Sequence, residues 1–344
     1  MSAQRCFKTF RPFLHGITVR PWLDGLSAAK LFQVGHEESQ SPTHSSTTGQ
    51  VIGLTQNITI RAPRNEEKRL FYEVFQSGLP GVDRMAFDGF SKWWDENVNR
   101  GTLSQLWRIA EARNRIVGVV VNTVSPVLKC GMICELAVLP KWRSKGIGTR
   151  LLQESERTLI GRDSTLTHFI LSAKTWNLEA LKFYERFGYS VRSLILHLQG
   201  SKSQLSSSPD TVVAKATSQH IVELCTLTPS AFWSARNQEG WSREVQAPSS
   251  YVVLAPRTLK VLGYFRAAKE EELEASTSVG FAFQAGHGPR ILDAATGHIE
   301  TEQMDLWIQD SHQDIIEYLY DRQFIRVDAE YLLKKAVPGA SGAE

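Results

Sequence analysis

One passage near the middle of the chain, from Leu136 to Leu152, limits the possible folds more than any other. It begins with an apolar, strand-like stretch that ends at Pro140, continues through a basic turn with two glycines, and enters a segment with leucines at helical spacing. The N-terminus of such a helix has free backbone N–H groups and the positive end of the helix dipole, so it binds anions. Gly146 and Gly148 lack a Cβ atom, which allows a phosphate to approach the backbone closely. The passage therefore predicts a site for a phosphate or pyrophosphate group.

Two common phosphate-binding motifs do not fit this turn. A dinucleotide-binding fold requires a third glycine where this chain has Leu151, and a P-loop requires a Gly-Lys-Ser/Thr sequence that closes a longer loop. The turn instead has Arg143 three residues before its first glycine, and Lys145 adds a second positive charge. In physical terms the turn is a cradle for pyrophosphate.

Residues 57 to 198 form one dense block of predicted elements, and the fold class that they predict is α/β. Apolar or alternating runs predict strands at residues 57–62, 106–111, 116–124, 132–139, 166–171 and 189–198. Helical spacing of apolar residues predicts helices at residues 65–77, 87–98, 146–160 and 177–187. The strand, helix and strand in the centre of the block imply a parallel pair with a right-handed crossover.

This block resembles the GCN5-related N-acetyltransferase (GNAT) superfamily in two separate motifs. The turn from Arg143 to Gly148 is similar to the R/Q-x-x-G-x-G/A motif, which cradles the coenzyme A pyrophosphate in that family. The segment from Asn177 to Tyr189 is similar to the family signature N-x-x-A-x-x-F-Y-x-x-x-G-F and follows at the family's spacing. The resemblance implies a GNAT fold, with a mixed central sheet flanked by helices, and acetyl-CoA as the cosubstrate without a metal ion.

The resemblance also implies roles for individual residues. Tyr184 matches the family tyrosine that protonates the leaving thiolate, although its position would also suit a core aromatic residue. The backbone N–H of Val138 would donate to the oxyanion that develops on the thioester. Asn177 would contact the pantetheine arm, and the same residue would serve as a helix N-cap. The residues assigned in this way to coenzyme A binding are Leu136, Ala137, Val138, Arg143, Ser144, Lys145, Gly146, Ile147, Gly148, Thr149, Asn177 and Phe183.

The general base is the least defined of these roles. Glu135 lies on the strand before the cradle, where several members of the family have an acidic residue, and it is our candidate base. Other members have their glutamate one position earlier, where this chain has Cys134. A shift by one residue moves a side chain to the other face of a sheet, so Glu135 could point away from the acceptor. A chain of water molecules is then the alternative.

The second half of the chain repeats parts of this outline. A serine-rich stretch predicts a linker at residues 201–210, between a GNAT domain at residues 56–200 and a second domain at residues 211–340. The clearest echo is the segment from Ile315 to Phe324, which resembles the segment from Ala180 to Tyr189. We interpret the second half as a degenerate GNAT-like domain that packs on the first and walls the acceptor groove.

This second half lacks the features that would bind coenzyme A. Its nearest candidate for a cradle is Gly286-His287-Gly288-Pro289-Arg290, where proline interrupts and no basic residue precedes. The position that matches the tyrosine is Leu319 or Tyr320, depending on the alignment. We therefore expect no coenzyme A binding there.

The N-terminal segment, residues 1–55, is predicted to be disordered. Residues 37–50 are polar and rich in serine and threonine, and the first acid is Asp24, after a basic and apolar start that is typical of mitochondrial transit peptides or of basic tails. The sequence has no run of about 18 apolar residues, so we expect no transmembrane helix. Its 4 cysteines form no C-x-x-C pair, which argues against a zinc site and favours a reducing compartment. We expect the protein in the cytoplasm, with the mitochondrion as the alternative.

The charge of the chain is uneven. Up to Gly200 the chain has 26 basic and 17 acidic residues, and from Leu205 onward it has 12 and 19. A basic first half suits a polyanionic ligand such as a nucleotide, although an uneven solvated surface has the same composition. Because the basic residues are scattered and not striped with aromatic residues, we expect no nucleic acid partner, and we expect no membrane partner.

These observations favour an acetyl-CoA-dependent N-acetyltransferase that acts on a primary amine by direct attack in a ternary complex. The alternative is a non-catalytic, regulatory acyl-CoA-binding protein that retains the cradle. The acceptor, a small-molecule or protein amine, the acyl-chain preference and the oligomeric state are not identified by the sequence. The second predicted helix contributes four residues that would form an acidic, aromatic wall for a cationic amine, by analogy with the fold: Trp93, Trp94, Asp95 and Glu96.

Overall fold

A computed structural model of the 344-residue chain describes residues 58–79, 86–206, 211–268 and 276–340. The disordered segment predicted at residues 1–55 lies outside the described residues, and so does the second part of the predicted linker, residues 207–210. The first part of that linker contains the short helix η4, in which the Lys202 Nζ donates to the carbonyl of Ile299 at 2.7 Å. No helix in the described ranges is long and apolar enough to cross a membrane.

The first half follows the predicted order of elements, with the short helix α3 in addition. Helix α1 illustrates the underlying pattern, because Phe71, Val74 and Phe75 recur at helical spacing and are buried. The elements are β1 (Ile58–Arg61), η2 (Asn65–Glu67), α1 (Lys68–Gly78), α2 (Phe87–Asn99), α3 (Thr102–Leu106), β2 (Arg108–Ala112), β3 (Arg115–Ser125), β4 (Cys130–Val138), η3 (Pro140–Trp142), α4 (Ile147–Arg162), β5 (His168–Lys174), α5 (Leu178–Glu185), β6 (Ser190–Ser201) and η4 (Lys202–Gln204).

The second half repeats this outline with shorter helices. A strand and helical turns come first, then three strands, and then alternating helices and strands. The elements are β7 (Val212–Lys215), η5 (Ser218–His220), α6 (Ile221–Leu224), β8 (Thr228–Pro229), η6 (Phe232–Ser234), α7 (Gln238–Glu244), β9 (Ser250–Leu254), β10 (Val261–Ala268), β11 (Ser276–Phe283), α8 (Gly288–Ala295), η7 (Thr296–His298), β12 (Gln303–Gln309), α9 (Gln313–Tyr320) and β13 (Ile325–Ala336).

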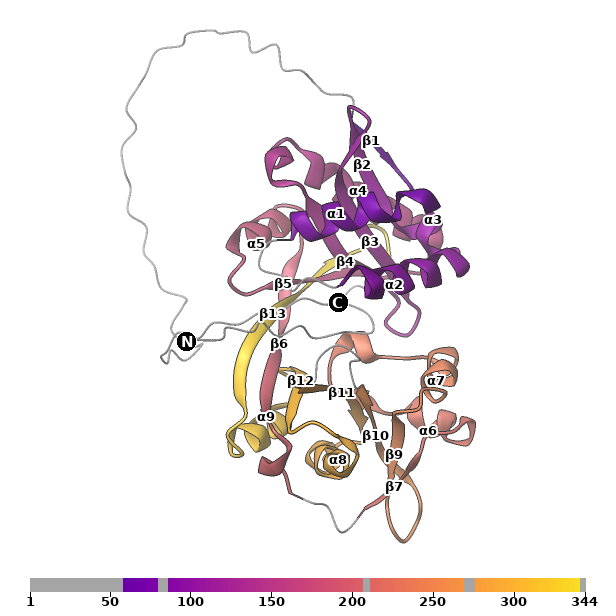
Figure 1. Cartoon of the computed structure of the whole chain (residues 1–344), viewed down its shortest axis with the longest axis vertical. Coiled ribbons are helices and arrows are strands. Elements are labelled where there is room, and N and C mark those ends of the chain that lie inside the picture. The colour runs from indigo at the N-terminus through magenta and orange to yellow at the C-terminus, as the bar shows by residue number, and fades with distance from the viewer. Residues whose placement is uncertain (1–57, 80–85, 207–210, 269–275, 341–344) are drawn as a thin grey trace, which may run out of the picture.

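The two halves exchange their last strands within one mixed sheet. Its order over the described residues is β1-β2-β3-β4-β5-β13-β6-β12-β11-β10-β9-β7. Strand β13, the last of the second half, lies between β5 and β6 of the first half, and β6 pairs in turn with β12 of the second half. Figure 1 shows the yellow strand β13 rising from the lower lobe beside β6 to reach β5 in the upper lobe. Each half therefore completes its sheet with a strand of the other.

Buried polar side chains line the seam where the strands are exchanged. The Lys174 Nζ lies 2.8 Å from an oxygen of Asp328 and 2.7 Å from an oxygen of Glu330, and all three side chains are nearly buried. The Nε2 of His197 on β6 lies 2.7 Å from Asp305 on β12. Each interaction joins the two halves, and it specifies the register because a slip by one residue would separate the paired groups.

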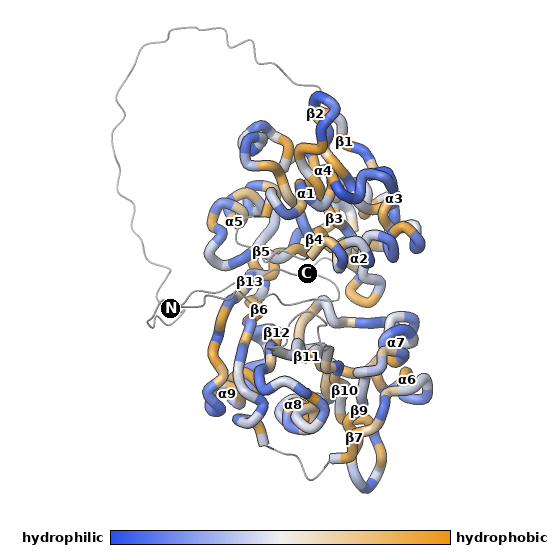
Figure 2. Tube along the Cα trace, in the orientation of Figure 1, coloured by the Kyte–Doolittle hydropathy of each residue, from blue (hydrophilic) through white to orange (hydrophobic). Residues whose placement is uncertain are grey.

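Helices cover the first half of the sheet on both faces. A Cβ atom on Gly78, at the end of α1, would lie 2.7 Å from the Cβ of Ala137, so α1 packs directly on β4. A Cβ atom on Gly118 of β3 would lie 2.9 Å from Leu151 of α4, so α4 covers the opposite face. In Figure 2 the hydrophobic stretches follow the strands and the inner sides of the helices, whereas hydrophilic residues gather on the outer turns. The strand and turn before α4 therefore lie between two packed layers.

A chain truncated at Ser206 tests whether the first half depends on the exchanged strand. Without β13, strand β5 becomes a sheet edge, and the burial of Leu332 and Leu333 alone is worth about 3–6 kcal/mol. This loss is comparable with the total stability of a domain, roughly 5–15 kcal/mol. We expect the truncated chain to lose cooperative unfolding in a denaturant titration followed by circular dichroism.

A chain truncated after Ala340 is the control, and it should unfold at the midpoint of the full chain. A cooperative transition at that same midpoint in the chain that ends at Ser206 would show that the first half is stable without β13.

Candidate active site

Strands β4 and β5 run side by side at one end and separate at the other. Their parallel pairing covers Cys130 with His168, Gly131 with Phe169 and Met132 with Ile170, and there it stops. Strand β4 nevertheless continues to Val138 and β5 continues to Lys174. Within the described residues no other strand pairs with β4 on that side, so the sheet is split between the carboxyl ends of the two strands.

The backbone of β4 directs hydrogen-bonding groups into this split. The N–H of Leu139 donates to the carbonyl of Val117 at 3.0 Å, and Val138 lies opposite Gly118 in the register. Because backbone groups alternate sides along an antiparallel pair, the N–H groups of Leu136 and Val138 face away from β3, toward the separated β5. The position proposed as the oxyanion donor therefore has its N–H directed into the split.

The turn after β4 adopts a conformation that its sequence requires. Ser144 and Gly146 have positive φ angles of 58° and 76°, and Gly146 is the N-cap of α4. A positive φ is costly for residues with a Cβ atom, and glycine avoids that cost. Among the described residues no side chain caps this helix, and its first turn contains no acidic residue. Its N-terminal N–H groups therefore remain available to an anion.

The two basic side chains of the turn are bound to the protein itself. The Arg143 Nε donates to the carbonyl of Val138 at 3.2 Å, and an Nη donates to the carbonyl of Gly78 at 2.9 Å. The Lys145 Nζ donates to the carbonyl of Lys141 at 2.9 Å and lies 5.1 Å from the centre of the Trp142 ring. Arg143 thus fastens the end of α1 to the end of β4, and both residues remain exposed to solvent.

The other residues assigned to the cofactor divide into two groups. The side chains of Ala137 and Ile147 are buried in the core, so that they offer a ligand their backbone groups alone. Gly148 faces the gap between the layers, because a Cβ atom there would lie 3.5 Å from the Phe183 ring and 3.9 Å from Leu136. Thr149 follows in the first turn of α4 and is half-buried. The structure thus brings the cradle, β4 and α5 together.

Helix α5 holds the other two predicted residues beside the split. The Asn177 Oδ1 accepts from the N–H of Ala180 at 3.1 Å, so its side chain is an N-cap. Tyr184 is 9% exposed, and its ring contacts Phe183 and Tyr189. In the described part of the chain its hydroxyl makes no hydrogen bond, which leaves it available to a ligand. Burial, and then the nearby Glu135 carboxylate, raise the pKa of the Tyr184 phenol.

A bulge in β4 answers the question of which way Glu135 points. In the pairing with β3, Val121 lies opposite Glu135 and the next residue, Asn122, lies opposite Ile133, so Cys134 is an extra residue. Glu135 shares a face with Ala137, the α1 face, because side chains alternate along a strand. The bulge places Cys134 on this face too, since it packs with Cys130 and Met132. Glu135 therefore lies on the face opposite α5, yet close enough to Tyr184 to raise the pKa of that phenol.

The predicted acidic, aromatic wall on α2 is wrong at Trp94, and for its other residues it stays a prediction. Trp94 is fully buried in an aromatic cluster with Phe71 and Trp107, so it cannot contact a ligand. Asp95 is paired with Lys68 at 2.7 Å, and Glu96 is paired with Arg100 at 3.4 Å. The predicted helix at residues 87–98 is confirmed as α2, but its tryptophans lie on the side that packs against the core. Trp93 is half-buried against Trp107, at 4.7 Å between ring centres.

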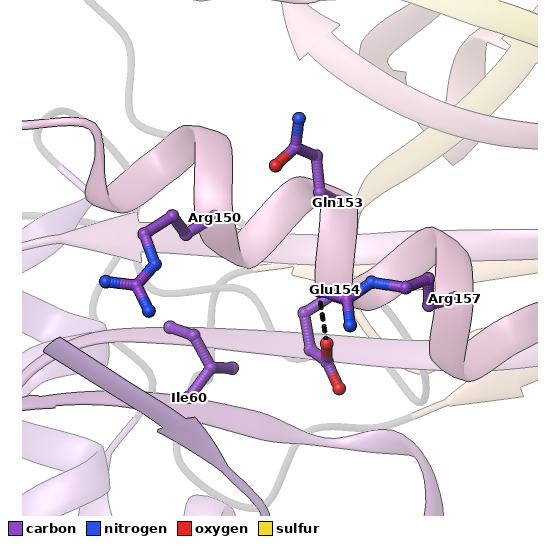
Figure 3. Close-up of a pocket in the computed structure, with 5 residues that line it drawn as sticks. All are labelled: Ile60, Arg150, Gln153, Glu154 and Arg157. Atoms are coloured by element: carbon purple, nitrogen blue, oxygen red, sulfur yellow. Dashed lines mark ion pairs between the residues drawn. The ribbon is translucent and has the colours of Figure 1, made fainter.

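A shallow pocket of about 260 Å³ on the outer flank of α4 is separate from this site. Figure 3 shows Arg150 and the paired residues Glu154 and Arg157 on α4, with Ile60 of β1 below them and Gln153 turned away. Strand β1 is the edge strand, three positions from β4 in the sheet order. The pocket therefore lies beside the edge strand β1 and not between β4 and β5.

The second half lacks the same arrangement. Helices α5 and α9 begin and end at equivalent positions of the two repeats, which places Leu319 at the position of Tyr184. Leu319 is fully buried. A Cβ atom on Gly288, at the start of α8, would lie 2.3 Å from Ile315, so that helix N-terminus is packed against α9. Neither Gly78 nor the bulge at Cys134 in the first half was identified from the sequence. For Gly78, its place at the end of a predicted helix was a usable signal.

Comparisons with known proteins identify the fold. Residues 65–189 match the family model described as Acetyltransferase (GNAT) family. The fold is similar to a GCN5-related N-acetyltransferase from Sphaerobacter thermophilus, with a TM-score of 0.61 and 12% identity over 81% of this chain and 95% of that one. The fold is also similar to a putative acetyltransferase from Pyrococcus horikoshii, with a TM-score of 0.60 and 12% identity over 88% of this chain and 95% of that one.

A tandem GNAT protein from the clavulanic acid biosynthesis pathway gives a TM-score of 0.57 and 12% identity over 84% of this chain and 100% of that one. A search of curated protein sequences gave no match. At such identities the likeness establishes the fold, which is the GNAT fold followed by a second region of sheet.

A pair of glycine substitutions in α4 tests the strained turn. Gly146→Ala should lower the free energy of unfolding by about 1–2 kcal/mol, because alanine disfavours a φ of 76° although the space around it is open. Gly161→Ala should raise it by about 0.5–1 kcal/mol, since this glycine is helical and also has open space. Urea titrations of both variants would measure the two changes, and equal effects would contradict the role assigned to Gly146.

Proposed function

We propose that this chain, which contains a domain of the GNAT acetyltransferase family at residues 65–189, transfers an acetyl group from acetyl-CoA to a primary amine. The observation that carries the proposal is the split between β4 and β5, with an uncapped helix N-terminus at one end and the Tyr184 hydroxyl beside it. Acetyl-CoA is the cosubstrate of the GNAT family.

The split and the turn suit the two parts of coenzyme A. The pyrophosphate carries negative charge, which the N–H groups of α4 and the adjacent Arg143 and Lys145 favour. The pantetheine arm contains amides, which can pair with the free N–H and C=O groups of β4 as a strand would. Gly148 lies between Phe183 and Leu136, so a larger residue there would narrow the space beside β4.

In the proposed reaction the acceptor nitrogen attacks the carbonyl carbon of the thioester, with both substrates bound. A C–N bond forms, the C–S bond breaks, and the electron pair of that bond leaves with sulfur. The N–H of Val138 donates to the oxyanion during the attack. Tyr184 donates its proton to the leaving thiolate, because its hydroxyl has no partner in the described part of the chain.

The proton that the amine loses goes to Glu135 in this scheme. Its carboxylate lies on the α1 face, opposite α5, so an acceptor that approaches from the α1 face would meet it first. Cys134 is a poor alternative, because burial raises the pKa of its thiol well above the usual value and keeps it neutral. In this scheme Glu135 accepts the proton of the amine, Val138 stabilises the oxyanion, and Tyr184 protonates the leaving group.

Tyr184→Phe tests the assignment of the general acid. Removal of the hydroxyl should lower kcat for acetyl transfer roughly 100- to 10,000-fold, the range of general acid–base catalysis. Stability and acetyl-CoA affinity should stay the same, because the ring remains and no hydrogen bond within the described protein is lost. Steady-state kinetics and calorimetric titration with acetyl-CoA would measure both.

Tyr189→Phe is the matched control, since this tyrosine lies 6.0 Å from Tyr184 between ring centres and its hydroxyl donates to Glu156 at 3.0 Å. It should lose about 1–3 kcal/mol of stability and keep its kcat. Acetyl-CoA binding without transfer to any amine, in the wild type, would favour the regulatory alternative. An unchanged kcat in Tyr184→Phe would remove Tyr184 from the mechanism.

The pH dependence of kcat gives an independent test. Burial, followed by the Glu135 carboxylate, raises the pKa of Tyr184 above its ordinary value of 10. A raised pKa keeps the phenol protonated at higher pH, so the general acid should persist as the pH rises to about 10. We expect kcat at saturating substrates to show no decline up to that pH, over the range where circular dichroism reports a folded protein. A decline that begins near neutral pH and is absent in Tyr184→Phe would contradict the assignment.

A further inference from the structure

The second half has a split of its own, and it is filled. Strands β11 and β12 pair in parallel from Ser276 with Gln303 to Ser278 with Asp305, and then separate as β4 and β5 do. Strand β11 continues to Phe283 and β12 to Gln309. The short strand β8 pairs with the free edge of β11, with Pro229 opposite Ala282 and Thr228 opposite Phe283.

Residues 228–230, which we call the plug, bridge both sides of this split. The N–H of Ser230 donates to the carbonyl of Phe281 on β11 at 3.0 Å, and the carbonyl of Ser230 accepts from Gln309 on β12 at 2.8 Å. The Nε2 of His312 donates to the carbonyl of Pro229 at 3.0 Å. His312 is the N-cap residue of α9, the position that Asn177 has in the first half. The chain itself thus fills the position between the two strands, where in the first half no strand of the described residues pairs with β4.

The plug carries the next residues onto the first half of the sheet. Ala231 is buried, and Phe232 and Trp233 pack in one cluster with Met132 and Ile170 of the first half. The rings of Phe232 and Trp233 stand edge to face, with 5.1 Å between their centres. Because the plug is held by three hydrogen bonds, this aromatic pair is fixed in place.

The aromatic pair covers the face of the sheet from which an acceptor would approach. Cys134 packs against the same cluster, and its neighbour Glu135 shares that face. This face is the one away from α4 and α5, where Tyr184 and the cradle lie. A ligand between the split and the second half would therefore lie against Phe232 and Trp233.

The charge on this face favours a cation. Lys174 lies at the end of β5, on the same face as Ile170 because side chains alternate along the strand. Its ammonium group lies against two carboxylates, those of Asp328 and Glu330. With Glu135 and Lys334 the face carries three carboxylates and two ammonium groups. An ammonium group near aromatic rings and carboxylates gains from both, since the faces of aromatic rings attract cations.

We propose that the plug converts the second half into the acceptor-binding wall of the first, and that Phe232 and Trp233 select a primary amine with an aromatic or other apolar body. This inference rests on the proposed function and adds the class of acceptor and the residues that recognise it. The second half binds no coenzyme A because its own chain occupies the equivalent split. The full chain therefore binds one molecule of acetyl-CoA.

A dead-end complex tests the wall without turnover. The full chain is saturated with coenzyme A, whose binding is first measured by calorimetry, and is then titrated with phenethylamine. We expect one coenzyme A per chain and measurable binding of the amine. The double variant Phe232→Ala, Trp233→Ala should bind the amine about tenfold more weakly, with coenzyme A affinity unchanged.

Three controls separate recognition from general effects. Tyr320→Ala removes a surface aromatic residue of the second half that is 45% exposed, and it should bind the amine like the wild type. Phenethyl alcohol has the same ring without the charge and should bind more weakly, as should ethanolamine, which has the charge without the ring. Thermal melts confirm that each variant is folded.

The outcomes distinguish the inference from the function on which it rests. Coenzyme A binding together with equal amine affinity in the wild type and the double variant overturns the wall and leaves the transferase proposal intact. Coenzyme A binding without amine binding also overturns the wall. Two coenzyme A molecules per chain overturn the plug, and no coenzyme A binding overturns both proposals.

Discussion

The insertion of β13 between β5 and β6 is the constraint on which the other features depend. It gives β5 a partner on the side away from β4, so that β5 can turn away from β4 without becoming a free edge. The same insertion ties Asp328 and Glu330 to Lys174 at the end of β5. The ladder of backbone hydrogen bonds therefore fixes where the split opens, and the buried ion cluster fixes the register that holds it there.

The same arrangement of two separating parallel strands occurs in both halves with different surroundings. In both, two parallel strands separate at their carboxyl ends, and a helix begins near the opening. In the first, the helix begins at a glycine with a positive φ and has no side-chain cap among the described residues. In the second, Ile315 presses on Gly288 and the plug bonds to both strands, so the opening has become an attachment point for a loop. The two halves thus share one strand geometry, and in the second a loop of the chain is bound between the strands.

Features with a local cause were predictable from the sequence, and features that depend on distant partners were not. The glycine turn and α4 follow from residues adjacent in the chain, and α2, predicted at residues 87–98, spans Phe87–Asn99. The alternation of apolar and polar residues predicts β13 as a strand, but it does not identify the strands beside it. The bulge at Cys134 is visible only against β3, so the sequence left the direction of Glu135 open. The charge of Arg143 predicts a contact with pyrophosphate. Its hydrogen bonds to Val138 and Gly78 depend on the packing of α1 against β4, which the sequence does not show.

The exchanged strand also sets the order in which the molecule can be completed during synthesis. The first half emerges from the ribosome with β5 and β6 made and their common neighbour still more than a hundred residues away in the chain. Until that neighbour arrives, β5 presents unpaired backbone groups, which are a template for association with other chains. Contacts over such sequence separations form slowly, because a long loop must close first. During each round of translation, β5 is therefore exposed to association with other chains until β13 has been synthesised and has paired with it.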